Sequence, residues 1–167
     1  MYDELTEVDI KKMQEELDHR IRVLRPQLIE EVQTARAFGD LSENFEYKCA
    51  KQAKNRNDSR IRYLERMIRT ARVIDEGGKN GGVALYDRVT VYLPEDGETE
   101  VLQVVTTMRK DPLKGIISRE SPVGRALLGK KLGDIVHIQV DEHYGYDMVI
   151  RAIEKGQDDG SIPINSY

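Results

Sequence analysis

Three carboxylate residues recur at a spacing of three near the middle of the chain: Asp40, Glu43 and Glu46. On a helix this spacing places side chains along one side, close to one another. Like charges at such close range repel, so the cluster is unfavourable on its own. A divalent cation from outside the chain would make it favourable, because hard divalent cations prefer oxygen ligands.

Helix capping is a second interpretation of the same residues. Asp40 can act as the N-cap of a helix and Glu43 as its partner at the third helical position, where the helix dipole favours negative charge. Gly39 would then end the preceding helix. Capping does not account for Glu46. It is also compatible with metal binding, because a capping carboxylate keeps a second oxygen free.

Two long helical patterns flank these acids, from about residue 8 to 38 and from about 43 to 74. Their apolar residues repeat at three-four and seven-residue spacing, which is typical of a coiled-coil seam. Because the connection is short, we expect the helices to pack antiparallel in an arm that reaches roughly 45 Å. Pro26 interrupts the first pattern, and we expect a kink there. The predicted seam residues are Leu17, Ile21, Leu24, Leu28, Ala35, Phe38, Ile61, Leu64, Ile68 and Ala71.

The second helical pattern carries a strong excess of positive charge. Residues 48–72 contain nine Lys or Arg and two acids, whereas residues 1–47 contain six basic residues and twelve acids. One interpretation is a solvated face that pairs with the acidic first helix. The other is a track for a phosphate backbone, without sequence-specific readout because few aromatic residues are available for stacking. The candidate residues of such a track are Lys48, Lys51, Arg56, Arg62, Arg66 and Arg69.

The residue pattern changes after a glycine-rich stretch, which indicates a second domain. We divide the chain into an arm at 1–76 with its acidic tip at 39–47, a linker at 77–83, a β-rich domain at 84–155 and a tail at 156–167. The tail combines Gly, Asp, Ser and Pro, and we expect it to fray.

Alternating apolar and polar residues predict four strands in the β-rich domain. They span residues 88–93, 100–107, 134–140 and 146–153. A short helix is expected over 121–129, with Ser121 as its N-cap, Pro122 at its first position and Gly129 as its C-cap.

Composition and missing motifs exclude several classes of function. No run of eighteen apolar residues exists, so no membrane span is expected, and the acidic first residues lack the apolar region of a signal peptide. Cys49 is the only cysteine, which excludes an internal disulfide and suits a reducing cytoplasm. No zinc-ligand spacing, nucleophile–base pair or phosphate-binding loop is present. We therefore expect a cytoplasmic protein with neither an active site nor a cofactor of its own.

Two motifs carry a resemblance to a known family. The string GDLSENFEY at 39–47, preceded by ARAFGD at 35–40, resembles the tip of the bacterial GreA/GreB transcript cleavage factors. The strings ISRESPVGRALLGK at 117–130 and GDIV at 133–136 resemble the C-terminal signature of that family. Leu41 resembles the A-type tip more than the B-type, whereas the large basic face resembles the B-type.

The resemblance implies an α+β fold. It consists of an N-terminal long antiparallel α-helical coiled-coil hairpin and a C-terminal FKBP-like antiparallel β-sheet domain with a short helix. The resemblance further implies a monomer that binds RNA polymerase at its secondary channel. There the factor stimulates the polymerase's own cleavage of backtracked RNA 3′ ends, so it is not itself an enzyme.

Site residues follow from the resemblance, residue by residue. Asp40 and Glu43 match the tip carboxylates that help to hold a second Mg²⁺ in the polymerase active site, and only in the complex. Glu46 is a further candidate for the same task. The basic face would hold the RNA 3′ segment, so its six residues Lys48, Lys51, Arg56, Arg62, Arg66 and Arg69 are the candidate RNA-binding residues. The residues expected to dock on the polymerase are Ser121, Pro122 and Arg125.

The chain departs from the family pattern at two places. Arg109 and Lys110 stand where Glu and Ala are common, which reverses the local charge, and we expect an effect on docking. Phe45 is bulkier than the residue expected beside the tip, and it either packs on the polymerase or staples the bend. Three other functions stay open: an inhibitor that binds the secondary channel, a prolyl isomerase suggested by fold analogy, and a coiled-coil adaptor whose tip acids are only caps.

Overall fold

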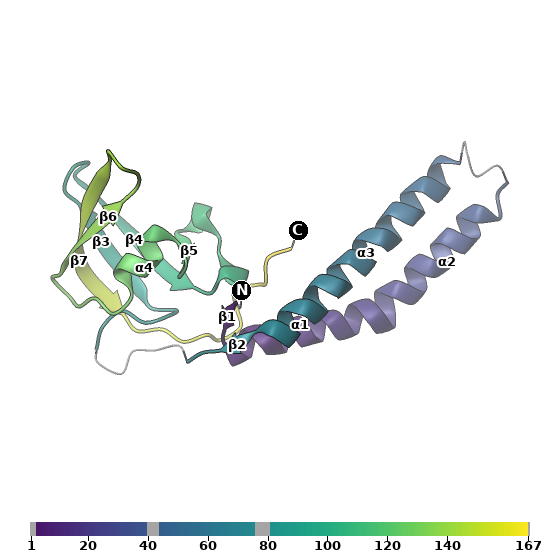
Figure 1. Cartoon of the computed structure of the whole chain (residues 1–167), viewed down its shortest axis with the longest axis horizontal. Helices are drawn as coiled ribbons and strands as arrows, with labels where there is room; N and C mark the ends of the chain where they lie inside the picture. The colour runs from purple at the N-terminus through teal and green to yellow at the C-terminus, as the bar shows by residue number, and fades with distance from the viewer. Residues whose placement is uncertain (1–2, 40–43, 76–80, 167) are drawn as a thin grey trace. The chain divides into compact units, whose positions relative to one another are not determined.

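The computed structural model describes residues 3–39, 44–75 and 81–166. The chain forms two compact units (Figure 1). The first unit contains Met1–Asp3 and Ile10–Ala71, and the second contains Glu4–Asp9 and Arg72–Tyr167. The first unit is helical and the second is built around a β-sheet, so the predicted α+β class is confirmed.

The helical unit is a pair of long antiparallel helices. The first is made of α1 (Glu7–His19), a π-helical turn (Arg20–Leu24) and α2 (Arg25–Arg36). The second is the single helix α3 (Phe45–Thr70), which packs along α2. Figure 1 shows the two rods side by side, as the spacing of apolar residues predicts.

The irregularity expected at Pro26 takes the form of the π-helical turn. Pro26 lies in the first turn of α2 and cannot donate a backbone hydrogen bond to the preceding turn. Just before it, the N–H of Arg25 bonds to the carbonyl of Arg20, five residues back, which is the wider π-type pattern. The helix therefore continues through the proline instead of ending there.

The seam of the helix pair is partly as predicted. Ala35, Ile61 and Leu64 are buried, and Leu17, Leu24, Leu28 and Ile68 are half-buried. Ile21 and Phe38 are exposed, so their assignment to the seam is wrong. The reason is that the π-helical turn contains Ile21 and shifts the phase of the repeat, while Phe38 follows the end of α2.

A polar layer interrupts the apolar seam. Glu16 accepts from Arg60 Nε at 2.9 Å and from Arg20 Nε at 2.8 Å. Arg20 also donates to Asn57 Oδ1 at 3.0 Å, which links the two helices again. Partial burial raises the pKa of Glu16, but the hydrogen bonds from Arg60 and Arg20 lower it more, so the net pKa lies below its ordinary value. Such a layer fixes the register of a helix pair, because a slipped register would leave these groups unpaired.

The second unit is built on a five-stranded sheet in the order β5-β4-β3-β7-β6. The strands are β3 (Arg88–Leu93), β4 (Glu98–Val105), β5 (Ile116–Ser118), β6 (Ile135–Gln139) and β7 (Gly145–Glu154). Four of them match the predicted strands to within two residues. The sheet is mixed and not antiparallel throughout as predicted, because β5 pairs with β4 in parallel. The strand β5 itself was not predicted. A separate parallel pair joins β1 (Glu4–Leu5) to β2 (Arg72–Val73).

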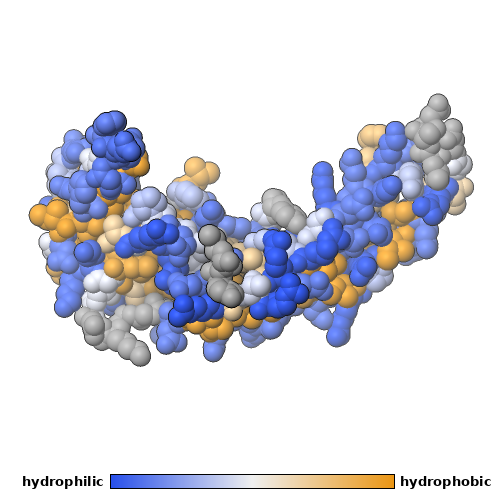
Figure 2. Space-filling model, viewed as in Figure 1, coloured by the Kyte–Doolittle hydropathy of each residue, from blue (hydrophilic) through white to orange (hydrophobic). Residues whose placement is uncertain are grey.

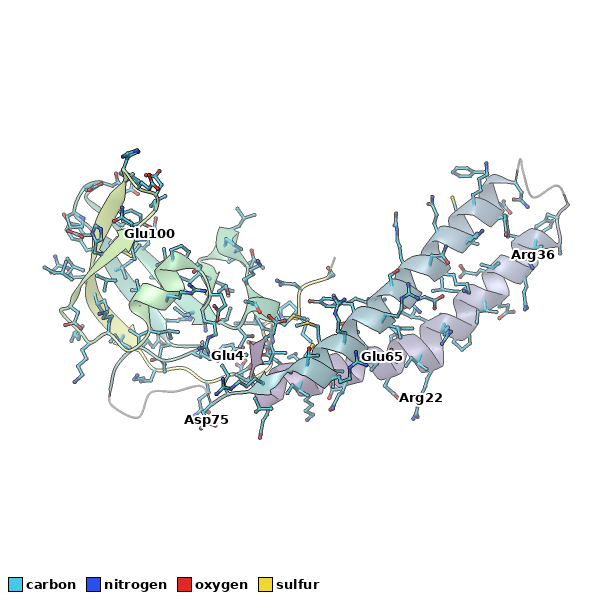
Figure 3. The ribbon with its side chains drawn as sticks, viewed as in Figure 1. Glu4, Arg22, Arg36, Glu65, Asp75 and Glu100 are labelled. Atoms are coloured by element: carbon cyan, nitrogen blue, oxygen red, sulfur yellow. The ribbon has the colours of Figure 1, made fainter. Side chains whose placement is uncertain are left out.

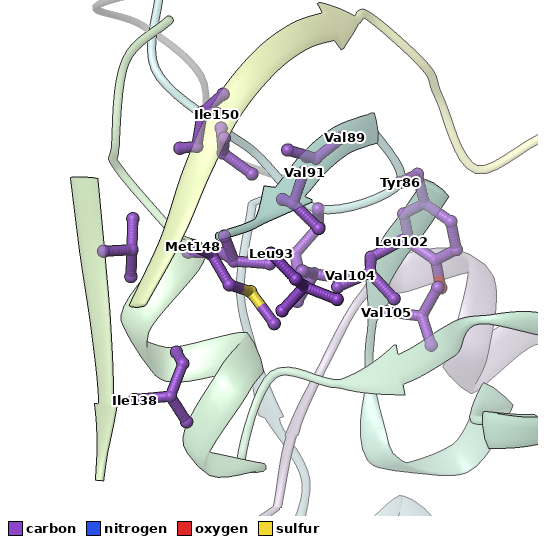
Figure 4. Close-up of a cluster of buried hydrophobic side chains, with 14 residues drawn as sticks. Tyr86, Val89, Val91, Leu93, Leu102, Val104, Val105, Ile138, Met148 and Ile150 are labelled. Carbon is purple, nitrogen blue, oxygen red and sulfur yellow. The ribbon is translucent and has the colours of Figure 1, made fainter. Parts of the chain in front are cut away.

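Alternation along the strands builds the core of this unit. Val89, Val91 and Leu93 of β3 point into it and are almost fully buried (Figure 4). The short helix α4 (Pro122–Leu127) packs on β6 and adds Leu127 to the core. This core fixes the positions of α4 and of the loops around it.

The C-terminal tail is held in place, which contradicts the expected fraying. Asp87 accepts from Lys155 Nζ at 2.8 Å and from the Gly156 N–H at 3.0 Å, so the start of the tail is anchored. Further on, Ile162 packs against the core and the N–H of Asn165 donates to the Met108 carbonyl at 2.7 Å. These contacts replace the freedom that the composition of the tail suggests.

Candidate functional site

The acids predicted to do chemistry lie in and beside the connection between α2 and α3. Asp40 and Glu43 fall outside the described residues. Glu46 is described: it lies in the first turn of α3 and is exposed. A carboxylate in that position is favoured by the helix dipole and is free to meet a ligand.

The residue that caps α3 is Asn44, not Asp40 as the capping interpretation predicts. Asn44 Oδ1 accepts from the N–H of Tyr47 at 3.0 Å. Its Nδ2 donates to the carbonyl oxygen of Ala35 at 2.7 Å, which ties the start of α3 to the end of α2. The start of α3 therefore does not depend on Asp40 or Glu43 as its cap.

A second contact joins the ends of the two helices. The Arg36 guanidinium lies over the Tyr47 ring, 5.7 Å from its centroid, and Figure 3 shows Arg36 near the end of α2. A hydrogen bond from Arg36 lowers the pKa of the Tyr47 phenol. Together with Asn44, this contact gives the two flanks of the tip a defined structure.

A groove of about 880 Å³ lies between α2 and α3 on the side of the tip. Small side chains form its floor, since Ala35, Ala50 and Ala53 leave the seam unfilled. Phe38 and Phe45, beside the tip, are 72% and 76% exposed. Phe45 therefore does not staple the bend, and its ring is available to a partner. The acidic residues at the groove are Glu30, Glu31 and Glu46.

The six predicted RNA-binding residues are all exposed on α3. None of them forms an ion pair with another residue in the part of the chain that the structure describes. The pairs that α3 makes in that part join Arg60 to Glu16, Lys54 to Asp58, and Asp58 to Arg25. Pairing with the acidic first helix therefore does not account for the six.

Five of the six basic residues form one stripe. At about 100° per residue they fall within roughly 60° of one another around α3, with Arg56 to one side. We call these five the basic stripe: Lys48, Lys51, Arg62, Arg66 and Arg69. Hydrophilic residues dominate the visible face of the helix pair in Figure 2. A row of exposed cations without ion pairs is suited to the phosphates of a nucleic acid.

The expected docking residues lie in α4 or directly before it. Ser121 is its N-cap, as predicted: Oγ accepts from the Gly124 N–H at 3.0 Å and donates to the Ser118 carbonyl at 2.7 Å. Pro122 occupies the first position of the helix and is exposed, as is Arg125. Ser121 thus builds the helix, while Pro122 and Arg125 form part of its outer surface.

Of the two basic residues that reverse the local charge at 109–110, only one has an exposed side chain. Lys110 is exposed, but the side chain of Arg109 is fully buried and paired with Asp9 and Asp158. Arg109 therefore cannot touch a partner, and the expected effect on docking is wrong for this residue. Its contacts are inside the second unit.

Within residues 3–39, 44–75 and 81–166, no group of three His, Cys, Asp or Glu side chains is placed to hold a metal ion. No helix in these segments is long and apolar enough to cross a membrane.

Known proteins with similar sequences match both units. The family model described as "Transcription elongation factor, N-terminal" matches residues 4–73. The model described as "Transcription elongation factor, GreA/GreB, C-term" matches residues 78–155. The helix pair, the sheet domain and these matches define a transcription elongation factor.

Two relatives by sequence agree with this class. The chain is 39% identical over 151 residues to transcription elongation factor GreA of Bacillus licheniformis, covering 90% of this chain and 94% of the relative. It is 40% identical over 134 residues to GreA of Staphylococcus carnosus, covering 80% and 84%. A solved structure of the transcription factor Gfh1 is 26% identical over 92% of this chain and 97% of that one, with a TM-score of 0.46. The chain belongs to the GreA/GreB family of transcription elongation factors.

Proposed function

We propose that this protein binds RNA polymerase and stimulates the polymerase's own cleavage of backtracked RNA. Membership in the elongation factor family supplies the class of function. The observation that supports stimulation of cleavage in particular is the N-cap of α3. This N-cap is Asn44 and not Asp40, which the capping interpretation predicts. A cluster of acids that the fold does not need as caps is suited to a task in a complex.

The task proposed for the acids is completion of a metal site in the polymerase. Two metal ions stabilise the attacking and the leaving oxygen in phosphodiester hydrolysis when both are bound. Asp40 and Glu43 supply oxygen donors of the type that Mg²⁺ prefers, and Glu46 adds an exposed carboxylate in the first turn of α3. These residues are proposed to act only when the polymerase supplies the rest of the site.

The basic stripe is proposed to hold the extruded RNA segment. Its five cations are exposed and free of ion pairs with described residues, so no ion pair with those residues has to break before RNA binds. Contacts to phosphates carry no sequence information, which suits a factor that must accept any transcript. The acids and the stripe share α3 or its N-terminal flank, so one helix would carry both functions.

Docking on the polymerase is proposed to use the surface of α4. Pro122 and Arg125 are exposed there, and Arg125 pairs with Glu120, at 2.8 Å, on the surface. An exposed ion pair of this kind contributes little to folding, so Arg125 is free to exchange Glu120 for an acidic partner.

The test is RNA cleavage in a stalled, backtracked elongation complex with Mg²⁺. Addition of the protein is expected to shorten the RNA from its 3′ end at a rate well above that of polymerase alone. Polymerase that has been inactivated in its own metal site is the control and should give no product with the factor. Slower cleavage on addition of the factor would instead identify an inhibitor of the secondary channel.

A further inference from the structure

Arg109 is the largest fully buried side chain among the described residues, and it is charged. Its Nη1 and Nη2 donate to the two carboxylate oxygens of Asp158 at 3.1 and 2.8 Å. Its Nε lies 2.9 Å from Asp9 Oδ1, in an ion pair that is too poorly aligned for a hydrogen bond. The side chains of Asp9 and Asp158 are 0% and 1% exposed. One guanidinium therefore holds two buried carboxylates from opposite ends of the sequence.

Asp9 connects this network to the first turn of α1. Its Oδ2 accepts from the N–H of Thr6 at 3.0 Å, and the N–H of Asp9 donates to Thr6 Oγ1 at 3.2 Å. This reciprocal pair is a capping box with Thr6 as the N-cap. One oxygen of Asp9 thus starts the helix and the other faces Arg109, which holds the start of α1 within the second unit.

Asp158 lies in a segment beyond the residues that the family model matches, since that match ends at residue 155. The segment adds a second acceptor for Arg109, because Nη1 also donates to the Ile162 carbonyl at 2.9 Å. Asp158 further accepts from Thr6 Oγ1 at 3.5 Å. The tail therefore surrounds the guanidinium and contacts the capping residue of α1 directly.

The segment that follows α3 lies beside the segment that precedes α1. β2 pairs in parallel with β1, and the N–H of Ile74 donates to the Leu5 carbonyl at 2.9 Å. The segments that precede α1 and follow α3 are thus held together within the second unit. Arg109 and Asp158 secure the first of these segments through Asp9.

We propose that Arg109 and Asp158 are positioning residues for RNA cleavage, acting through the first turn of α1. The proposal rests on the function proposed above. A freedom of about 10° at the base of a helical arm of roughly 45 Å moves its far end by about 8 Å. Misplacement of a reacting group by about 1 Å can cost about 100-fold in rate. The tail would therefore determine how well the tip acids are placed, while the docking surface stays intact.

Asp158→Asn and Asp159→Asn make a matched pair of variants in the full chain. Both replace one carboxylate by an amide, but Asp159 is exposed and accepts from the N–H of Ser161 within its own loop. Cleavage rate at saturating factor and affinity for polymerase are measured separately. We expect Asp158→Asn to lower the saturated rate about tenfold or more with an affinity within about twofold of wild type. Asp159→Asn should change neither, and Asp158→Glu should recover part of the rate.

Equal saturated rates for Asp158→Asn and Asp159→Asn would overturn the proposal. So would a loss of affinity that matches the loss of rate, because that is the effect of general misfolding. Amide hydrogen exchange at Val8, Asp9 and Ile10 gives a readout that does not need polymerase. Faster exchange in Asp158→Asn alone supports positioning even if the wild-type factor fails to stimulate cleavage, and unchanged exchange contradicts it.

Discussion

Asn44 and Ala35 are joined across the end of the helix pair by a hydrogen bond of 2.7 Å from Asn44 Nδ2 to the Ala35 carbonyl oxygen. Ala35 lies in the last turn of α2, where carbonyl groups lack partners within the helix, and Asn44 is the N-cap of α3. One amide side chain therefore satisfies an end of each helix. The flanks of the acidic tip are fixed without the tip acids themselves.

Asn44→Ala should weaken the start of α3. Loss of an N-cap costs about 1 kcal/mol. The Ala35 carbonyl would also lose its bond from Asn44 and keep the longer one from the Phe38 N–H, at 3.3 Å. Chemical denaturation measures the change in the free energy of unfolding. Asn44→Asp is the matched variant: it keeps the acceptor for the Tyr47 N–H but cannot donate to Ala35, so it should lose only part of the stability. Equal stability of wild type and Asn44→Ala would contradict the assigned cap.

Combined Arg62→Ala, Arg66→Ala and Arg69→Ala substitutions should weaken binding to a backtracked complex. Removing one cation that binds a phosphate of single-stranded RNA should lower the slope of log affinity against log salt by about 0.7, so removing three should lower it by about 2. The control is Arg22→Ala, because Arg22 is exposed on the other helix and projects away from the pair (Figure 3). If Arg22→Ala and the triple variant changed the salt slope equally, the proposed role of the basic stripe in RNA binding would be contradicted.

Glu16→Gln should destabilise the helix pair at neutral pH and matter less in acid. The folded pKa of Glu16 is lowered below its ordinary value of 4.5. Its charge therefore adds stability above pH 4.5, and this contribution disappears as the pH falls through the folded pKa. Urea midpoints at about pH 7 and about pH 3 measure the difference between variant and wild type. Glu15→Gln, an exposed neighbour, is the control. A pH-independent difference would contradict the role of the Arg60 and Arg20 bonds.

Arg125→Ala should lower affinity for polymerase without lowering stability, because Arg125 is exposed and its ion pair with Glu120 lies at the surface. Ser121→Ala should lower stability by about 1 kcal/mol, because it removes the N-cap of α4. Competition binding and thermal unfolding separate the two effects. Unchanged affinity in Arg125→Ala would remove this residue from the docking surface.

Local patterns in the sequence predict much of this fold. Alternation places β3, β4, β6 and β7, and the Ser-Pro pair places the start of α4, because these signals act within a few residues. β5 is missed because its three residues are too few to alternate visibly. The heptad pattern fails at Ile21 because Pro26 signals an irregularity in the helix but does not show that a π-helical turn will precede it.

Local sequence signals also do not predict the contacts around the candidate site. Three residues with N-cap character, Asp40, Ser42 and Asn44, stand before the second helix, and sequence spacing alone does not select Asn44. The partners of Arg109 lie 100 residues before it and 49 residues after it, so no local pattern indicates that they meet. The one available signal is the capping-box spacing of Thr6 and Asp9.

Asp40 and Glu43 are proposed to act in cleavage and not in folding or in binding to polymerase. The most direct test measures cleavage in a backtracked complex with Asp40→Ala or Glu43→Ala, alongside competition binding to polymerase. We expect each variant to lose stimulated cleavage, with its polymerase affinity and helix content unchanged. Stimulation at the wild-type rate, or a loss of binding that accounts for the loss of cleavage, would contradict this role.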